Sequence, residues 1–401
     1  MENEMKAREA EELIREIREG KTERCPEIRE RLLETELTEE AFSSEVLFRW
    51  YETIRKVPAE AFAARARTRI TVSMTSWPGR IAFAAEALKG IYAQTRKADR
   101  ILLWLAEEQF PGKESDLPDA LAEQVREGLA EIRWCEDLKS HKKYFFALQE
   151  NTDGVTVTAD DDLVYVPEML ELLFLSWLRH PEAVSAMRTH YMAVSENGEI
   201  LPYAYWVKET DARIDVPDLL LFATTGAGTL YPAGIIGKEW FDREAVRETC
   251  LTADDLWMKA AEAMLDIPVV QACRNRGLKY VPGSQEGTLW EANREGNDAQ
   301  VKKILDWVSG KYGPGALEKK LAAAGGGLAA YAFFAGNDTE KWKAKLKQTY
   351  REKSELNREY YRLKDRVNVL EGEVEALRGS RDYRLGHALL APVRKLRGTQ
   401  K

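Results

Sequence analysis

Three consecutive carboxylates follow a short β-branched segment near the middle of the chain. Residues 155–165 read VTVTADDDLVY, so that Asp160, Asp161 and Asp162 come directly after residues that favour a strand. Adjacent like charges repel one another and are costly to bury, so core packing does not require them. Mg²⁺ and Mn²⁺ take oxygen ligands and often join one or two carboxylates to substrate phosphates. The run therefore predicts a metal and diphosphate site at the carboxyl end of a buried strand.

The segments before the carboxylates alternate between strand and helix patterns. Strands are predicted at 70–75, 101–105 and 132–134, separated by helices that run from Pro78 to about residue 94 and over about 116–128. A further helix, 141–150, leads into the strand at 155–158, and later elements include a helix at 167–179 and strands at 184–187 and 230–232. This alternation predicts an α/β fold with a mostly parallel sheet and helices on both faces.

An Asp-x-Asp pair at a strand end has two main enzymatic interpretations. One is a site for a metal-bound nucleotide-diphosphate sugar. The other is a haloacid-dehalogenase-like phosphatase, because Asp160, Asp162 and Val164 fit the D-x-D-x-[TV] signature. The phosphatase nucleophile normally lies at the end of the first strand of its domain. Three strand–helix units precede Asp160, and this order favours a nucleotide-sugar site. A nucleotidyltransferase is a third option, but its Gly-rich basic loop is lacking, since residues 75–80 hold one Gly and one Arg.

Five motifs in order resemble one enzyme family. The sequence is similar to bacterial GT-A-fold glycosyltransferases of capsule, lipopolysaccharide or cell-wall glycan assembly, some of which end in a coiled coil. The resemblance covers about residues 69–290. The matching motifs are ITVSMTSWPGR (70–80), DLKSHKKY (137–144), TADDDLVY (158–165), GAGTLYP (226–232) and TADDLW (252–257).

The resemblance implies roles for individual residues. Asp160 and Asp162 would bind Mn²⁺ or Mg²⁺ and the nucleotide-sugar donor, and Asp161 could be held by hydrogen bonds in the turn. Arg80 and Lys143 could pair with phosphate, although either could equally be an ordinary charged surface residue. The residues expected near the donor nucleotide are Thr75, Ser76, Arg80, Lys143, Asp160 and Asp161.

Asp255, with Asp254 second, is the predicted catalytic base. An inverting transfer needs a carboxylate that takes the proton of the acceptor hydroxyl. The two acids could instead only compensate the dipole of the helix that they open. Gly226 and Gly228 resemble the loop under the sugars or form a plain turn. Four aromatic residues could stack on sugar rings or form core: His190, Tyr203, Tyr205 and Trp206. His141 has no obvious acid partner and is expected at the surface.

Four regions are predicted along the chain. Residues 1–66 form a helical region without visible chemistry, and 67–325 form the GT-A-like catalytic domain. Residues 326–379 carry a heptad series from Leu346 to Leu377, which predicts a coiled coil or a single helix folded back. Residues 380–401 are basic and amphipathic, and they either contact an anionic membrane surface or form a solvated tail.

Composition excludes several classes of protein. The formal net charge of −8 over 401 residues argues against a general nucleic-acid binder. The four cysteines form no CxxC pair, and with four His a zinc site is not expected, so a reducing cytoplasmic location is the simplest interpretation. The expected partners are a nucleotide sugar, a glycan or lipid-linked acceptor, a second copy through the coiled coil and the inner face of the cell membrane. A non-catalytic scaffold built around the coiled coil stays an alternative.

Overall fold

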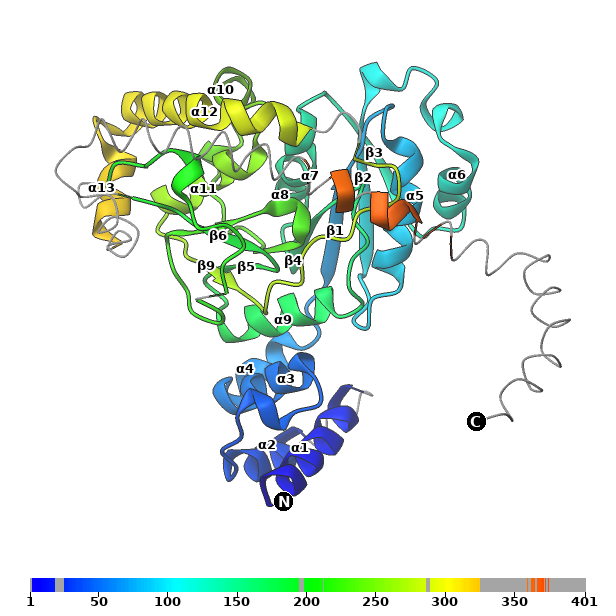
Figure 1. Cartoon of the computed structure of the whole chain (residues 1–401), viewed down its shortest axis with the longest axis vertical. Helices are drawn as coiled ribbons and strands as arrows, with labels where there is room; N and C mark the ends of the chain where they lie inside the picture. The colour runs from blue at the N-terminus through cyan, green and yellow to red at the C-terminus, as the bar shows by residue number, and fades with distance from the viewer. Residues whose placement is uncertain are drawn as a thin grey trace, which may run out of the picture. The chain divides into compact units, whose positions relative to one another are not determined.

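The computed structural model divides the chain into two compact units, residues 1–278 with 288–337 and residues 279–287 with 338–401. Figure 1 shows the elements coloured along the chain. The structure describes the following residues: 2–18, 25–194, 198–211, 213–285, 289–324, 359, 362–364, 366–370, 372 and 374.

A seven-stranded mixed sheet forms the centre of the first unit. Its strand order is β3-β2-β1-β4-β8-β5-β9, and β8 alone runs antiparallel to its neighbours within this sheet. The predicted α/β fold with a mostly parallel sheet is therefore confirmed. The strands are β1 (Ile70–Thr75), β2 (Arg100–Ala106), β3 (Glu131–Cys135), β4 (Val155–Asp160), β5 (Val184–Ala186), β8 (Thr229–Pro232) and β9 (Val269–Gln271).

Helices connect the parallel strands on both faces of this sheet. The step from β1 to β2 and the step from β3 to β4 run in opposite directions along the sheet, so right-handed crossovers place α5 and α7 on opposite faces. The helices of this part are α5 (Ile81–Tyr92), α6 (Asp119–Arg126), α7 (Lys142–Phe145), α8 (Ala147–Glu150) and α9 (Met169–Arg179). Short 3-10 turns lie at Glu107–Gln109, Lys113–Asp116 and Lys139–His141.

The second half of the first unit adds a small sheet and a helical layer. Strands β6 (Thr189–Tyr191) and β7 (Leu221–Ala223) pair antiparallel, and their apolar side chains join the core that α11 covers. The remaining helices are α10 (Arg243–Thr249), α11 (Asp254–Met264), α12 (Leu289–Tyr312) and α13 (Ala316–Ala323). Further 3-10 turns lie at Tyr203–Tyr205, Thr225–Ala227 and Lys238–Trp240. Strands β6, β7 and β9 were not predicted, because three-residue strands carry too few positions to show a period. Helix α12 was not predicted either.

Four helices precede the sheet and lie together beside α9 (Figure 1). They are α1 (Glu2–Arg18), α2 (Cys25–Leu33), α3 (Glu45–Lys56) and α4 (Ala59–Arg65), with a 3-10 turn at Glu39–Ala41. Helix α3 buries Leu47, Trp50, Tyr51 and Ile54 at helical spacing, so it presents an apolar face to its neighbours. The predicted helical character of this region is therefore present in the described residues.

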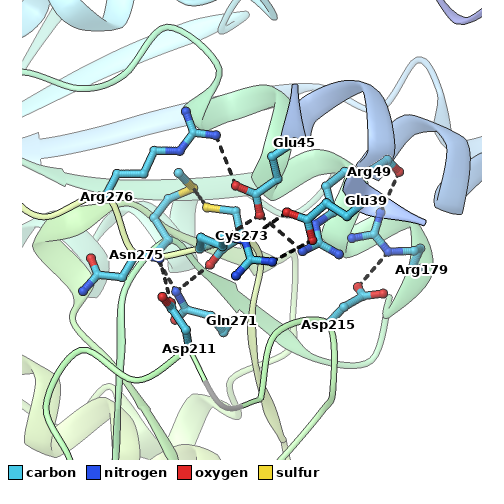
Figure 2. Close-up of polar contacts among 12 residues, drawn as sticks. Glu39, Glu45, Arg49, Arg179, Asp211, Asp215, Gln271, Cys273, Asn275 and Arg276 are labelled. Atoms are coloured by element: carbon cyan, nitrogen blue, oxygen red, sulfur yellow. Dashed lines mark hydrogen bonds and ion pairs between the residues drawn. The ribbon is translucent and has the colours of Figure 1, made fainter. Parts of the chain in front are cut away.

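Charged contacts tie these helices to the chain beyond β9 (Figure 2). The carboxylate of Glu45 lies 3.2 Å from Arg49 within α3 and 3.3 Å from Arg276. Arg274 pairs with Glu39, with its Nε 2.9 Å from a carboxylate oxygen. Because Arg274 and Arg276 are partly exposed, their two ion pairs orient these helices more than they stabilise the fold.

In the second unit, the described residues between 359 and 374 are helical. Four apolar residues of the predicted heptad series lie there at 4-3-4 spacing, and they are exposed by 58%, 51%, 50% and 44%: Leu363, Val367, Leu370 and Val374. Most of the predicted coiled coil and the whole basic tail, 380–401, fall outside the described residues, so both stay predictions.

Among the described residues, Cys135, Cys250 and Cys273 are buried free thiols. No helix in the described ranges has the length and apolarity needed to cross a bilayer.

Candidate active site

The sheet register brings two predicted motifs side by side. Thr75, the last residue of β1, lies opposite Asp160, the last residue of β4. The turn that carries Ser76 and Arg80 therefore starts beside the three carboxylates. Thr75 donates a hydrogen bond to the carbonyl of Trp104 at 2.8 Å, which fixes the end of β1 against β2.

The three carboxylates differ in environment. The Asp160 side chain is 38% exposed, whereas Asp161 and Asp162 are buried. The Ser76 hydroxyl donates to Asp161 at 2.5 Å, and Arg80 lies 3.2 Å from Asp161 and also pairs with Asp162. Burial raises the pKa of Asp161 to about 7 despite the charge of Arg80. Asp161 is thus held by hydrogen bonds in the turn, while Asp160 presents oxygen to solvent.

Lys143 joins this strand end to the start of α11. Helix α7 packs against β1, β2 and β4, so its four side chains are buried, Lys143 included. The Lys143 ammonium lies 2.7 Å from Asp160 Oδ1 and 3.0 Å from Asp254 Oδ2. Burial alone would lower the pKa of Lys143, but the surrounding carboxylates outweigh it and raise the pKa. The Lys143 side chain is therefore a fixed positive charge between the two acidic motifs.

Thr225 holds the second acidic pair. Its backbone N–H lies 2.9 Å from Asp255 Oδ1, and its hydroxyl lies 2.5 Å from that oxygen and 2.7 Å from Asp254 Oδ2. A hydroxyl has one hydrogen to donate, so a proton on one of the carboxylates completes this arrangement.

The two acids of this pair are shifted in opposite directions. Burial and the charge of Asp254 raise the pKa of Asp255 to about 7. Burial also opposes ionisation of Asp254, but Lys143 and the neighbouring hydrogen-bond donors, Thr225 among them, together outweigh it and hold the pKa of Asp254 below its usual range. Asp254 is buried and Asp255 keeps part of its surface exposed. Asp255 is therefore the acid of this pair that has both access and a pKa close to neutrality.

The Gly-rich loop passes directly over Asp160. A Cβ atom at Gly226 would lie 1.7 Å from Asp160 Oδ2, so any side chain there would displace the carboxylate. Gly228 adopts a φ of +104°, which disfavours other residues. Tyr165 secures the contact: its hydroxyl donates to the carbonyl of Gly226 at 2.6 Å and accepts from the N–H of Asp160 at 2.6 Å.

Tyr165 and Thr225 complete the site, and the sequence analysis did not single them out. Tyr165 stood only as the last residue of a quoted motif, and Thr225 lay in an unremarkable part of the loop. Each acts through contacts with residues 29 to 61 positions away, for which one sequence gives no signal.

His141, His190 and Trp206 do not line the site. His141 is buried rather than at the surface, and its ring nitrogens lie 2.8 Å from the Tyr144 hydroxyl and 2.9 Å from the carbonyl of Cys250. Burial lowers the pKa of His141 to about 4, so the ring is neutral at pH 7. His190 and Trp206 are both 3% exposed and pack against Phe222, so they belong to the core and do not form a sugar platform.

The donor atoms at this edge fit a hard divalent cation. Five carboxylates gather around two cations, Lys143 and Arg80; they are Asp160, Asp161, Asp162, Asp254 and Asp255. In the part of the chain that the structure describes, no three His, Cys, Asp or Glu side chains form a ready-made metal cage. One or two carboxylates with substrate phosphate suffice for Mg²⁺, so the excess of acid is suited to a cation that arrives with its substrate.

Comparisons with known proteins add a structural match. No protein-family model and no curated protein matches the sequence. A solved mannosyltransferase from Pyrobaculum calidifontis, in complex with GDP-Man and Mn²⁺, matches the structure with 15% sequence identity and a TM-score of 0.36. The match covers 76% of this chain and 87% of the mannosyltransferase chain. The candidate site is therefore assigned from its own residues.

Proposed function

We propose that this protein is a metal-dependent glycosyltransferase that moves a sugar from a nucleotide-diphosphate donor to a glycan or lipid-linked acceptor. One observation carries the proposal. Lys143 bridges Asp160 and Asp254, which brings an exposed carboxylate at a strand end next to an accessible acid, Asp255, whose pKa is raised to about 7. Metal and donor need the first acid, and activation of an acceptor hydroxyl needs the second.

Donor binding would use the edge formed by β1 and β4. Asp160 and Asp162 would hold Mg²⁺ or Mn²⁺, which neutralises the diphosphate leaving group when bound. Arg80 lies beside both of the buried acids and carries the positive charge nearest to the turn, so it would face a donor phosphate. Thr75 and Ser76 would fix the backbone on which the nucleotide lies.

The transfer step would use Asp255 as general base. The carboxylate takes the proton of the acceptor hydroxyl as that oxygen attacks the anomeric carbon, and the sugar–phosphate bond breaks on the opposite side. A single displacement of this kind inverts the configuration of the sugar. Lys143 is then a positioning residue, since its buried ammonium contacts the acids and orients them. We assign Asp254 the same positioning role.

A phosphatase that uses Asp160 and Asp162 is the second candidate, because its signature is present. The contacts of Asp162 disfavour it. The leaving group would need a proton from Asp162, whereas the Arg80 guanidinium already occupies that carboxylate. Release of phosphate from small phosphoesters would support this candidate.

Donor binding is the first test. The thermal midpoint of the full chain would be measured with UDP, GDP and dTDP sugars, in Mn²⁺, Mg²⁺ or EDTA, because a ligand of the folded state raises the midpoint. We expect a metal-dependent rise with one nucleotide that Asp160→Asn abolishes. Asp153→Asn is the matched control, since Asp153 lies just before the other end of β4 and is 65% exposed. No rise with any nucleotide in either metal would refute the transferase.

The second unit supports a further part of the proposal. The exposed residues at heptad positions, such as Val367 and Leu370, match the face that a second coiled-coil helix covers, so we propose a homodimer. Light scattering of the full chain should show a dimer that Val367→Glu with Leu370→Glu dissociates and that Arg362→Glu, at an outward heptad position, leaves intact. A monomer in the unmodified chain would contradict it. The basic tail would place the enzyme in the cytoplasm at the inner membrane face, in surface polysaccharide synthesis.

A further inference from the structure

A cavity of about 540 Å³ lies between the N-terminal helices and the sheet domain. It is in the size range of small-molecule sites. Its walls come from α1, α3, α4, α9 and the segment that joins α5 to β2. The lining residues are Arg15, Ile17, Arg18, Trp50, Phe62, Ala66, Thr95, Arg96, Lys97, Glu171 and Phe174.

The charged residues of the cavity are predominantly basic. Four cations and one acid, Glu171, line it; Arg15 also pairs at 3.2 Å with Glu11, which is not part of the lining. Three donors already satisfy the Glu171 carboxylate: Arg18 at 2.6 and 2.8 Å, the Trp50 indole N–H at 2.6 Å and the Thr95 hydroxyl at 2.6 Å. The positive charge of Arg96 and of the exposed Lys97 therefore has no paired carboxylate in the cavity lining.

Arg96 is the most informative residue of the wall. Its guanidinium lies 3.4 Å from the centre of the Phe174 ring, and one terminal nitrogen donates to the carbonyl of Ala66 at 3.0 Å. Its Nε is covered by protein atoms and has no hydrogen-bond partner in any described range. An oxygen anion in the cavity would therefore accept from the terminal nitrogens of the guanidinium and balance its charge.

The other half of the wall is apolar. Ile17, Trp50, Phe62, Ala66 and Phe174 supply aromatic and aliphatic surface next to the cationic half. A ligand that fills the cavity must therefore combine an anionic group with a flat or alkyl part.

We propose that this cavity is a second binding site, which takes an amphipathic anion: a phosphate ester whose organic part packs on Trp50 and Phe62 and whose phosphate accepts from Arg96. Either a nucleoside phosphate or a phospholipid headgroup has this chemistry. The site gives residues 1–66 a role, because three of the five walls come from that region.

This cavity is separate from the catalytic edge. Thr95, Arg96 and Lys97 precede the start of β2, where Arg100 lies opposite Thr71 of β1, whereas Asp160 lies opposite Thr75. Four residues of strand span about 13 Å. The two sites therefore lie toward opposite ends of the parallel strands, and the cavity is not part of the proposed donor site.

Calorimetric titration of the full chain at low salt tests the proposal. Inorganic phosphate, AMP and dihexanoyl phosphatidic acid are the three probes, and AMP is titrated into the Asp160→Asn protein so that the donor site does not contribute. We expect saturable binding of at least one ester, tighter than that of inorganic phosphate. The preferred ester then distinguishes a nucleotide source from a lipid source.

Two variants locate the binding. Arg96→Met keeps the stem and removes the donors, so affinity should fall about tenfold or more. Ala66→Trp fills the cavity and should abolish binding even if Arg96→Met perturbs the fold. Arg126→Met, at the exposed end of α6, should bind normally. No binding of either ester, equal binding of inorganic phosphate, or unchanged binding in the Ala66→Trp protein would overturn the proposal.

Discussion

The carboxyl ends of the strands and the cavity beneath the N-terminal helices are opposite in charge. At the first, five carboxylates gather around two cations, and two of the acids have a pKa raised to about 7. At the second, four cations face one acid, which three donors already satisfy. Each region thus keeps polar groups that the protein alone does not balance. Uncompensated charge of one sign indicates a ligand of the other, which is the basis of both proposals.

The two regions also differ in how they are connected. Lys143 links the acidic motifs from within, so the removal of one group disturbs several partners. The contacts of Glu171 instead join separate elements of the fold, α1, α3 and α9. Substitutions at the first region should therefore change the rate of transfer. Substitutions at the second should loosen the packing of α1 and α3 on α9.

Removal of the proposed base should have the largest effect. Asp255→Asn keeps an acceptor for the Thr225 N–H but no longer takes a proton, so transfer should fall by about 10² to 10⁴-fold. Donor binding should remain, because Asp160 and Arg80 are unchanged. Steady-state transfer rates and the donor-induced rise in thermal midpoint would be measured together. A variant with nearly normal turnover would assign the base elsewhere.

Removal of the central cation should have the next largest effect. Lys143→Met leaves Asp160 and Asp254 without their shared partner, and breaking a buried ion pair costs about 3 kcal/mol or more of unfolding free energy. Urea unfolding would measure it. The double variant Lys143→Met with Asp254→Asn should recover part of the loss, since fewer acids then lack a partner. An additive loss in the double variant would show that the bridge is not the source of the stabilisation.

The pH dependence of transfer should follow Asp255. The base acts when deprotonated, so with a pKa raised to about 7 the rate should increase about tenfold per pH unit below 7 and level off above it. Asp254→Asn removes one of the charges that raise this pKa, so the rise should move to lower pH. The pH profiles of kcat for the two proteins would be compared. If the pH profile of the Asp254→Asn protein matches that of the unmodified protein, Asp254 does not raise the pKa of the catalytic base.

Disruption at the N-terminal helices should have the smallest effect on transfer. Glu171→Gln replaces a buried carboxylate that accepts from Arg18, Trp50 and Thr95, and we expect a loss of about 1–3 kcal/mol in unfolding free energy with near-normal turnover. Hydrogen exchange of α1 and α3 amides should increase. Arg274→Ala is the control, because Arg274 is 57% exposed and a surface pair contributes about 1 kcal/mol at most. A large loss of turnover in Glu171→Gln would contradict this prediction and show that transfer depends on the packing of the N-terminal helices.

Local sequence patterns predicted much of the sheet and its acidic edge. The β-branched runs at β1 and β4, the alternation with helices and the triple Asp each act over a few residues, so they are visible without the fold. From these follow the parallel strands and the gathering of Thr75, Ser76, Arg80 and Asp160 at one edge. Asp254 and Asp255 were identified as well. Their link to this edge through Lys143 was not.

Contacts between distant residues decided the rest. Lys143 meets Asp254 across 111 positions, and Arg18 meets Glu171 across 153. The buried state of Lys143, the placement of Tyr165 and Thr225 and the basic cavity all depend on how elements pack. A sequence determines which residues can form a strand or carry a charge, because those properties are local. Which charges are buried, paired or left in excess is decided by tertiary structure, because desolvation and Coulomb interactions depend on distances that only the folded chain sets.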